Sequence, residues 1–410
     1  MGLGRVDDGA AISAMLVAAM STQLLHEEVR SAVSQLGTLL RALILAAGSD
    51  PGKPQEVHRK FGIDRVLCWK ISRIIKAASA EEALRQLPGE ESFSIFTSAA
   101  ERAGAPAADA KRTLDASRAL YVAIDTYVGD RPTLELLLDS VPKGSEGLLV
   151  SRKLAFRGTS GIWGVQARSR VQMLLLAPNA EDPERIDAVA AAGWVDFRRL
   201  RLNAPWRLFR NRVLPEDDGK TSRRAPLSPN DMTGLMPDFC SNVPELKPVQ
   251  DGEYTEYEVG PSRPGSSGAF TVFSAFVRRS HGYLYAKQPH DMVEWSVSIQ
   301  APVESVVIDV LVHRSLNLMH DGKLTLVSGA FSEGQRTRAD QVLPIEGVRE
   351  ELGSPPLVAG THAPQMPELA AHLFKQQGWD ASEFIGYRYK VEYPPFPSMV
   401  WLTGELPERP

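Results

Sequence analysis

The spacing of apolar residues divides the chain into two parts. From residue 9 to residue 140, apolar side chains recur every three or four positions in a background rich in Ala, Leu, Arg and Glu. This period is typical of amphipathic helices. Stretches with Gly and Pro at 48–54, 87–91 and 102–109 interrupt it and predict breaks between helices.

After about residue 147 the period drops to two, which predicts strands. Residues 160–178 alternate strictly between apolar and polar side chains, while 180–193 resemble a helix ended by glycine. The glycine-rich segment GTSGIWG (158–164) is interpreted as a hairpin turn rather than a phosphate loop, because it lacks the Lys-Ser/Thr ending. One further helix is expected at 366–379, and further strands are expected at 269–279, 292–300, 304–314, 323–329 and 387–393.

These patterns predict a multidomain α+β protein. Its expected parts are an all-helical domain at 1–147, a β-containing α+β segment at 148–214, a linker or long loops at 215–267, and a β-rich α+β domain at 268–410.

Composition limits the function classes. The net charge is −4, so the chain as a whole is no polycation and any basic site must be local. Two cysteines exclude a disulfide framework and a four-cysteine zinc site. The apolar run at 11–20 is shorter than the ~20 residues that span a bilayer. It also lacks the basic start of a secretory signal. We therefore expect a cytoplasmic protein that does not enter a membrane.

The segment PQEVHRKFGIDRVLCWKISRIIKA (54–77) carries the clearest functional signal. Its apolar residues predict two short helices joined at Gly62, which can adopt the left-handed conformation of a helix C-terminus. Asp64 is well placed to cap the second helix. The second helix has an apolar stripe that should pack on the helix before residue 48: Leu67, Cys68, Ile71, Ile74 and Ile75.

This segment resembles the helix-turn-helix of bacterial DNA-binding transcription regulators, over about two dozen residues. In that pattern a glycine joins the helices, with apolar residues five and one before it and one, six and nine after it. Here these positions are Val57, Phe61, Ile63, Cys68 and Ile71. The departure is His58, where the family prefers a small residue such as alanine.

The resemblance implies that the second helix enters the major groove of DNA. Arg65 and Trp69 would face the bases, flanked by Lys70 and Arg73. Phosphates would be met by four other basic residues: Lys53, Arg59, Lys60 and Lys76. Charge supports this locally, because residues 53–76 have a balance of +5, whereas residues 77–130 have a balance of −4.

A second basic segment, FRRLRLNAPWRLFRNR (197–212), interleaves six arginines with aromatic residues. It could extend a nucleic-acid contact through Arg198, Arg199, Arg201, Trp206, Arg207, Arg210 and Arg212. The alternative, slightly favoured, is a strand and turn whose arginines pair with acids elsewhere in the fold.

No catalytic, metal or cofactor site is predicted. His290 and His320 are each followed by an aspartate, and His281 and His313 lie in the same strand region. A zinc site needs three or four convergent ligands, and no such spacing is present. Ordinary surface or core histidines are the better interpretation.

The resulting expectation is a regulator that binds double-stranded DNA as a homodimer. Its C-terminal part would sense a small-molecule effector or mediate self-association. One alternative is an enzyme or small-molecule-binding protein with its site in 148–410, favoured if His290, His313 or His320 meets carboxylates in a pocket. The other is an interaction module without chemistry, in which Trp69 and Arg73 would be buried.

The sequence yields one test. Arg65→Ala should relax sequence preference, while Lys60→Ala should weaken all DNA binding and reduce its salt dependence. Fluorescence anisotropy of labelled duplex DNA at two salt concentrations measures both effects. Unchanged binding in both variants would count against a DNA-binding segment.

Overall fold

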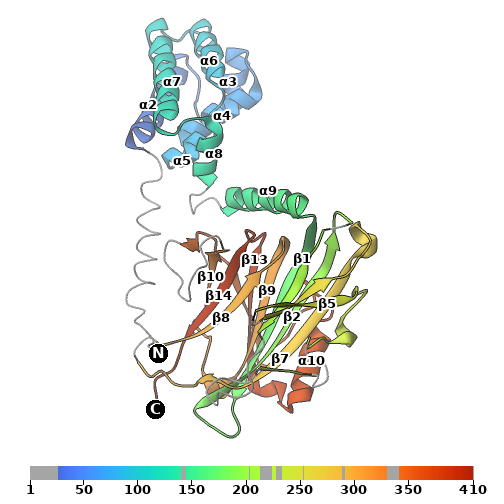
Figure 1. The fold of residues 1–410 in the computed structure, drawn as a ribbon. Helices are drawn as coiled ribbons and strands as arrows, with labels where there is room; N and C mark the ends of the chain where they lie inside the picture. The colour runs from blue at the N-terminus through green and yellow to red at the C-terminus, as the bar shows by residue number, and fades with distance from the viewer. Residues whose placement is uncertain are drawn as a thin grey trace. The chain divides into compact units, whose positions relative to one another are not determined.

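The computed structural model describes residues 26–139, 145–202, 204–212, 224–227, 233–252, 254–288, 291–329 and 341–409. The chain forms two compact units, Met1–Leu148 and Leu149–Pro410 (Figure 1). The described helices lie mostly in the first unit and the sheets in the second, which confirms the α+β class. The apolar run at 11–20 lies outside the described residues.

The described part of the first unit is helical. Its helices are α2 (Glu27–Ala46), α3 (Pro54–Phe61), α4 (Arg65–Lys76), α5 (Ala80–Arg85), α6 (Glu90–Arg102), α7 (Ala107–Tyr127) and α8 (Arg131–Asp139). The three predicted breaks fall between α2 and α3, between α5 and α6, and between α6 and α7.

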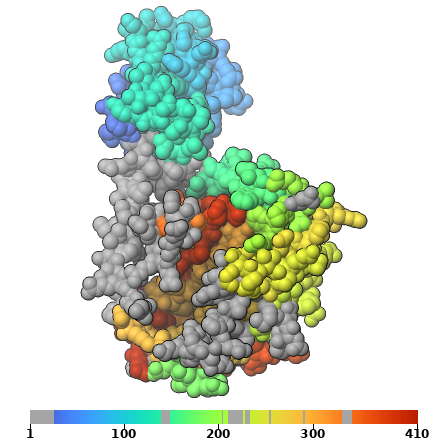
Figure 2. All heavy atoms as spheres, viewed as in Figure 1, coloured from blue at the N-terminus to red at the C-terminus, as the bar shows by residue number. Residues whose placement is uncertain are grey.

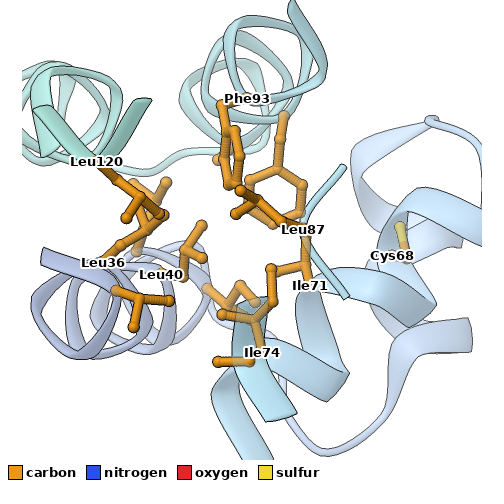
Figure 3. Packing of buried hydrophobic residues seen from close by; sticks show 14 of the residues in the cluster. Leu36, Leu40, Cys68, Ile71, Ile74, Leu87, Phe93 and Leu120 are labelled. Atoms are coloured by element: carbon orange, nitrogen blue, oxygen red, sulfur yellow. The ribbon is translucent and has the colours of Figure 1, made fainter. Parts of the chain in front are cut away.

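One apolar core joins these helices. Leu36 and Leu40 of α2, Ile71 of α4, Phe93 of α6 and Leu120 of α7 are fully buried and converge in Figure 3. Among the described helices, α2 is long and apolar enough to cross a membrane on length and composition alone. Its buried apolar side chains belong to this core: Val29, Val33, Leu36, Leu40, Leu43 and Ile44.

The second unit contains a seven-stranded sheet in the order β12-β13-β9-β1-β2-β7-β4. Its strands are β1 (Val165–Pro178), β2 (Arg185–Arg199), β4 (Arg224–Pro226), β7 (Phe270–Tyr283), β9 (Val303–His313), β12 (Val348–Gly353) and β13 (Phe384–Glu392). β1 pairs with β9 in parallel, and the other neighbours are antiparallel.

The described strands of the second unit also form two smaller sheets. One has the order β11-β10-β14-β8, formed by β8 (Met292–Ile299), β10 (Lys323–Ser328), β11 (Val342–Leu343) and β14 (Ser398–Glu405). The other has the order β3-β6-β5, formed by β3 (Arg207–Arg212), β5 (Leu246–Asp251) and β6 (Tyr254–Val259). Figure 2 shows residues of this last sheet, in yellow, on the surface of the unit.

Helices flank the sheets of the second unit. α9 (Ser145–Trp163) leads into β1, and α10 (Met366–Gln377) packs on the large sheet through Leu369 and Leu373. Short 3-10 helices occupy connections in the described residues: η1 (Pro237–Phe239), η2 (Gly265–Gly268), η3 (Arg314–Leu316) and η6 (Ala381–Glu383). The predicted strands at 269–279, 292–300, 304–314, 323–329 and 387–393 and the helix at 366–379 are confirmed, with shifted ends.

The prediction for 180–193 was wrong. This alanine-rich segment forms most of β2, because it pairs with β1 on one side and β7 on the other, and such pairing outweighs the helix propensity of alanine. Gly193 does not end a helix. A Cβ there would collide with the ring of Phe273 on β7, so the glycine permits close strand packing.

Two boundaries also differ from expectation. Residues 158–163 continue α9 instead of forming a hairpin turn, and only Gly164, at φ +75°, turns the chain into β1. The strand therefore begins at Val165, later than the alternation suggested. The expected linker at 215–267 contains β4, β5, β6 and η1, which pair or pack with strands from both flanking segments.

A buried ion pair crosses from β9 to β13. Arg388 donates Nε to Oδ1 and Nη2 to Oδ2 of Asp309, both at 2.7 Å, and Nη2 also donates to the carbonyl of Ala359. Asp309 is 0% exposed and Arg388 is 4% exposed. Burial raises the pKa of Asp309, an effect that Arg388 opposes. Removing one partner would leave the other charge desolvated and unpaired.

We predict that Asp309→Ala lowers the free energy of unfolding of the second unit by about 3–5 kcal/mol. Glu392→Ala, which breaks the more exposed Lys390–Glu392 pair, should cost less than about 1 kcal/mol. Urea unfolding followed by tryptophan fluorescence measures both, since six of the seven tryptophans lie in this unit. Equal effects of the two substitutions would refute the special role of the buried pair.

Candidate nucleic-acid interface

The turn between α3 and α4 is fixed by three local interactions. Gly62 ends α3 in the left-handed conformation, at φ 63° and ψ 34°. Asp64 caps α4, its Oδ1 accepting a hydrogen bond of 3.0 Å from the backbone N–H of Leu67. Nδ1 of His58 donates to the carbonyl of Ile63 at 2.5 Å. His58 is half-buried, and its hydrogen bond links α3 to the turn. An alanine at this position could not form that bond.

The inner face of the pair is apolar and buried. Val57, Phe61, Ile63, Cys68 and Ile71, the five positions that carry the resemblance, are each at most 8% exposed. The ring of Phe61 lies 5.5 Å from that of Phe96, which joins α3 to α6. Burial raises the pKa of the Cys68 thiol to about 11, so the group is neutral at pH 7. Cys68 therefore packs as a small apolar residue.

The outer face of α4 carries large exposed side chains. Arg65 and Arg73 are exposed, Trp69 is 45% exposed and Lys70 is half-buried. The guanidinium carbon of Arg73 lies 4.7 Å from the ring centre of Trp69, a cation–π contact. Val66, which the sequence analysis did not single out, is 60% exposed on the same side. The sequence does contain a sign of this exposure. Val66 follows Arg65 just after the cap and does not belong to the apolar stripe that packs on α2.

The seven basic residues of the segment divide by what they contact. Lys60 donates to the carbonyl of Gly48 and Lys76 to that of Gly52, both at 2.9 Å. Lys53 lies 3.7 Å from Asp50 and 4.0 Å from Glu56. Within the described residues no hydrogen bond or ion pair engages the remaining four: Arg59, Arg65, Lys70 and Arg73.

These contacts make Lys60→Ala a poor test of DNA binding alone. Because Lys60 binds the carbonyl after α2, Lys60→Ala would disturb the fold as well as a phosphate contact. Arg59, one residue away, has no such bond. It also lines a shallow surface hollow of about 630 Å³ with Lys53, Lys60 and Glu56 at the start of α3. Arg59 is therefore the cleaner probe of a phosphate contact.

The second basic segment is largely engaged within the fold. Arg199 is 4% exposed and donates to the carbonyl of Val259 at 2.6 Å. Arg207 pairs with Glu256 on β6. Trp206 packs edge-on against Trp163, with ring centres 5.8 Å apart. These contacts favour the strand-and-turn alternative over a nucleic-acid surface.

The other predicted residues of this segment add little to a shared surface. The exposed Arg201 donates to the carbonyl of Ile162 at 2.6 Å. Arg198 donates to the side-chain oxygen of Gln166 through Nε at 2.8 Å and Nη2 at 2.6 Å. The side chains of Arg210 and Arg212 lie outside the described residues.

The histidines do not assemble a metal site in the part of the chain that the structure describes. His313 lies 3.2 Å from Oε2 of Glu383 through Nε2 and 2.8 Å from Oγ of Ser315 through Nδ1. Its Nδ1 also accepts from the backbone N–H of Ser315, so His313 caps η3. His290 lies outside the described residues, and burial lowers the pKa of His281 to about 4.

Comparison of the chain with protein-family models, curated proteins and solved structures gives no match. The geometry of α3 and α4 and the charges around them are therefore the basis for a functional argument.

We predict that Gly62→Ala lowers the free energy of unfolding of the first unit by about 1 kcal/mol. A Cβ at Gly62 meets no atom within 4 Å, so the cost is that of the left-handed backbone alone. Gly37→Ala, inside α2 with its Cβ 3.8 Å from the Ile74 carbonyl, should instead stabilise by up to about 1 kcal/mol. Far-UV circular dichroism during urea unfolding measures both. A change of the same sign at both positions would contradict this account of the turn.

Proposed function

We propose that this protein is a DNA-binding transcriptional regulator in which the α3–α4 pair is a helix-turn-helix. The observation that carries the proposal is the outer face of the pair. Arg59, Arg65, Lys70 and Arg73 have no acidic partner within the described residues, and Trp69 stands among them. A basic surface without internal partners, on two short helices packed on a core, fits the phosphates and base edges of a major groove.

The exposure of this face favours DNA binding over a purely structural role. In an interaction module without chemistry, Trp69 and Arg73 were expected to be buried inside the fold. Trp69 is instead 45% exposed, and Arg73 is exposed with its guanidinium over the Trp69 ring. Since neighbouring cations repel one another, a helix pair that keeps three exposed cations and one half-buried cation unpaired is best explained by a polyanionic partner.

The enzyme alternative has less support. His313 meets a carboxylate, as that alternative required, but its contacts are those of a helix cap with the exposed carboxylate of Glu383. The second unit is proposed to sense a small-molecule effector or to mediate self-association. We propose binding as a homodimer, because a single short helix reads few base pairs. A cytoplasmic location belongs to the same proposal.

The deciding experiment is fluorescence anisotropy of a labelled duplex titrated with the full-length chain at ~50 mM and ~150 mM salt. Binding should weaken steeply with salt as counterions are released. We predict that Arg59→Ala weakens binding to all sequences and reduces the slope of log K against log salt by about 1. Arg65→Ala should mainly reduce the preference between sequences.

The matched control is Arg118→Ala. Arg118 is an exposed arginine of α7, 60% exposed and 3.9 Å from Asp115, outside the proposed interface. Its removal should leave both affinity and salt slope unchanged. Absence of binding at ~50 mM salt, or equal losses for Arg59→Ala and Arg118→Ala, would overturn the proposal.

A further inference from the structure

Two large apolar side chains stand on the otherwise basic outer face of α4. Val66 is 60% exposed and Trp69 is 45% exposed, three residues apart and therefore on one side of the helix. Single exposed apolar residues need no explanation, but a pair among unpaired cations marks a surface that contacts something. Cations alone would suffice to hold a phosphate backbone, so the apolar pair requires a second kind of contact.

Arg73 is oriented by the same surface. Its guanidinium lies over the Trp69 ring at 4.7 Å, and no hydrogen bond engages its N–H groups within the described residues. The contact with the ring restricts the position of the group and leaves its N–H groups available to donate. A guanidinium held in this way loses less conformational entropy when it forms a forked pair of hydrogen bonds.

We propose that Val66 and Trp69 contact thymine methyl groups in the major groove, and that Arg73 reads a neighbouring guanine. This inference rests on the proposed function and names the bases that the interface recognises. The 5-methyl group of thymine is the apolar group that base edges present in that groove, and O6 and N7 of guanine accept the fork of an arginine. Adenine or cytosine against Trp69 would leave polar edge groups desolvated without a partner.

The helix geometry sets the spacing of the two bases. Trp69 and Arg73 are four residues apart, which corresponds to a rise of about 6 Å along α4. Successive base pairs are about 3.4 Å apart. The recognised thymine and guanine should therefore lie within about two base pairs of each other.

The test starts with a pool of duplexes randomised at their centre, selected with the full-length chain at ~150 mM salt. The enriched duplex is then synthesised twice, once with thymine and once with deoxyuridine, which lacks only the methyl group. Replacing the recognised thymine should weaken binding about fourfold, as expected when one methyl-sized contact is lost. Trp69→Ala should reduce the difference between the two duplexes, and Arg73→Met should lose the preference for guanine at the neighbouring position.

Val122→Ala is the matched control, because Val122 is 63% exposed on α7, away from this face. It should retain the full difference between thymine and deoxyuridine. Selected sequences that bind equally well with deoxyuridine would overturn this inference while the proposed function stands. No enrichment and no salt-sensitive binding would overturn both. Circular dichroism of Trp69→Ala shows whether a loss of discrimination comes from a lost contact or from a lost fold. The comparison of the two duplexes uses the unmodified protein, so it does not depend on the folding of any variant.

Discussion

The burial of one side of α4 is the constraint on which the proposed interface depends. Cys68, Ile71 and Ile74 are at most 4% exposed, and Figure 3 shows Ile71 and Ile74 pointing toward Leu36 and Leu40 of α2. Because an α-helix turns about 100° per residue, fixing these side chains in the core also fixes which residues face outward. Arg65, Trp69 and Arg73 are exposed because the opposite side has no freedom to rotate. A substitution that weakens this core would therefore disturb the outer face even when every residue on that face is unchanged.

The second unit depends on contacts between residues that are far apart in the sequence. β1 and β9, about 140 residues apart in the sequence, run in parallel at the centre of the large sheet. The same sheet includes β4, β12 and β13, so segments that look separate along the chain share one set of backbone hydrogen bonds. The bidentate pair between Asp309 and Arg388 adds a directional link across β9 and β13. This architecture makes 149–410 one compact unit and leaves no independent linker in its described residues.

This difference in range explains what could be predicted from the sequence. The turn at Gly62 and the cap at Asp64 depend on neighbours within five residues, so their positions followed from local chemistry. The strand at 185–199 depends on β1 and β7, and its alanines carry no local sign of that pairing. In the candidate interface, spacing identified the exposed face. The structural roles of Lys60 and Lys76 could not be seen, because their acceptors are backbone carbonyls 12 and 24 residues away.

Some basic side chains of the segment form hydrogen bonds within the fold and others do not, and this difference limits how strongly one copy would bind DNA. A charge balance of +5 over 53–76 overstates the interface, because two of the seven basic side chains serve the fold. Arg65 and Arg73 are proposed to meet bases, so Lys53, Arg59 and Lys70 are left to neutralise about three phosphates, which gives a log–log salt slope of about −2.7 for one copy. So small a footprint gives modest affinity. The proposed regulator therefore needs a second copy on an adjacent half-site to reach the affinity usual for specific recognition. A self-associating second unit would meet that need, so the small size of the interface supports the proposed homodimer.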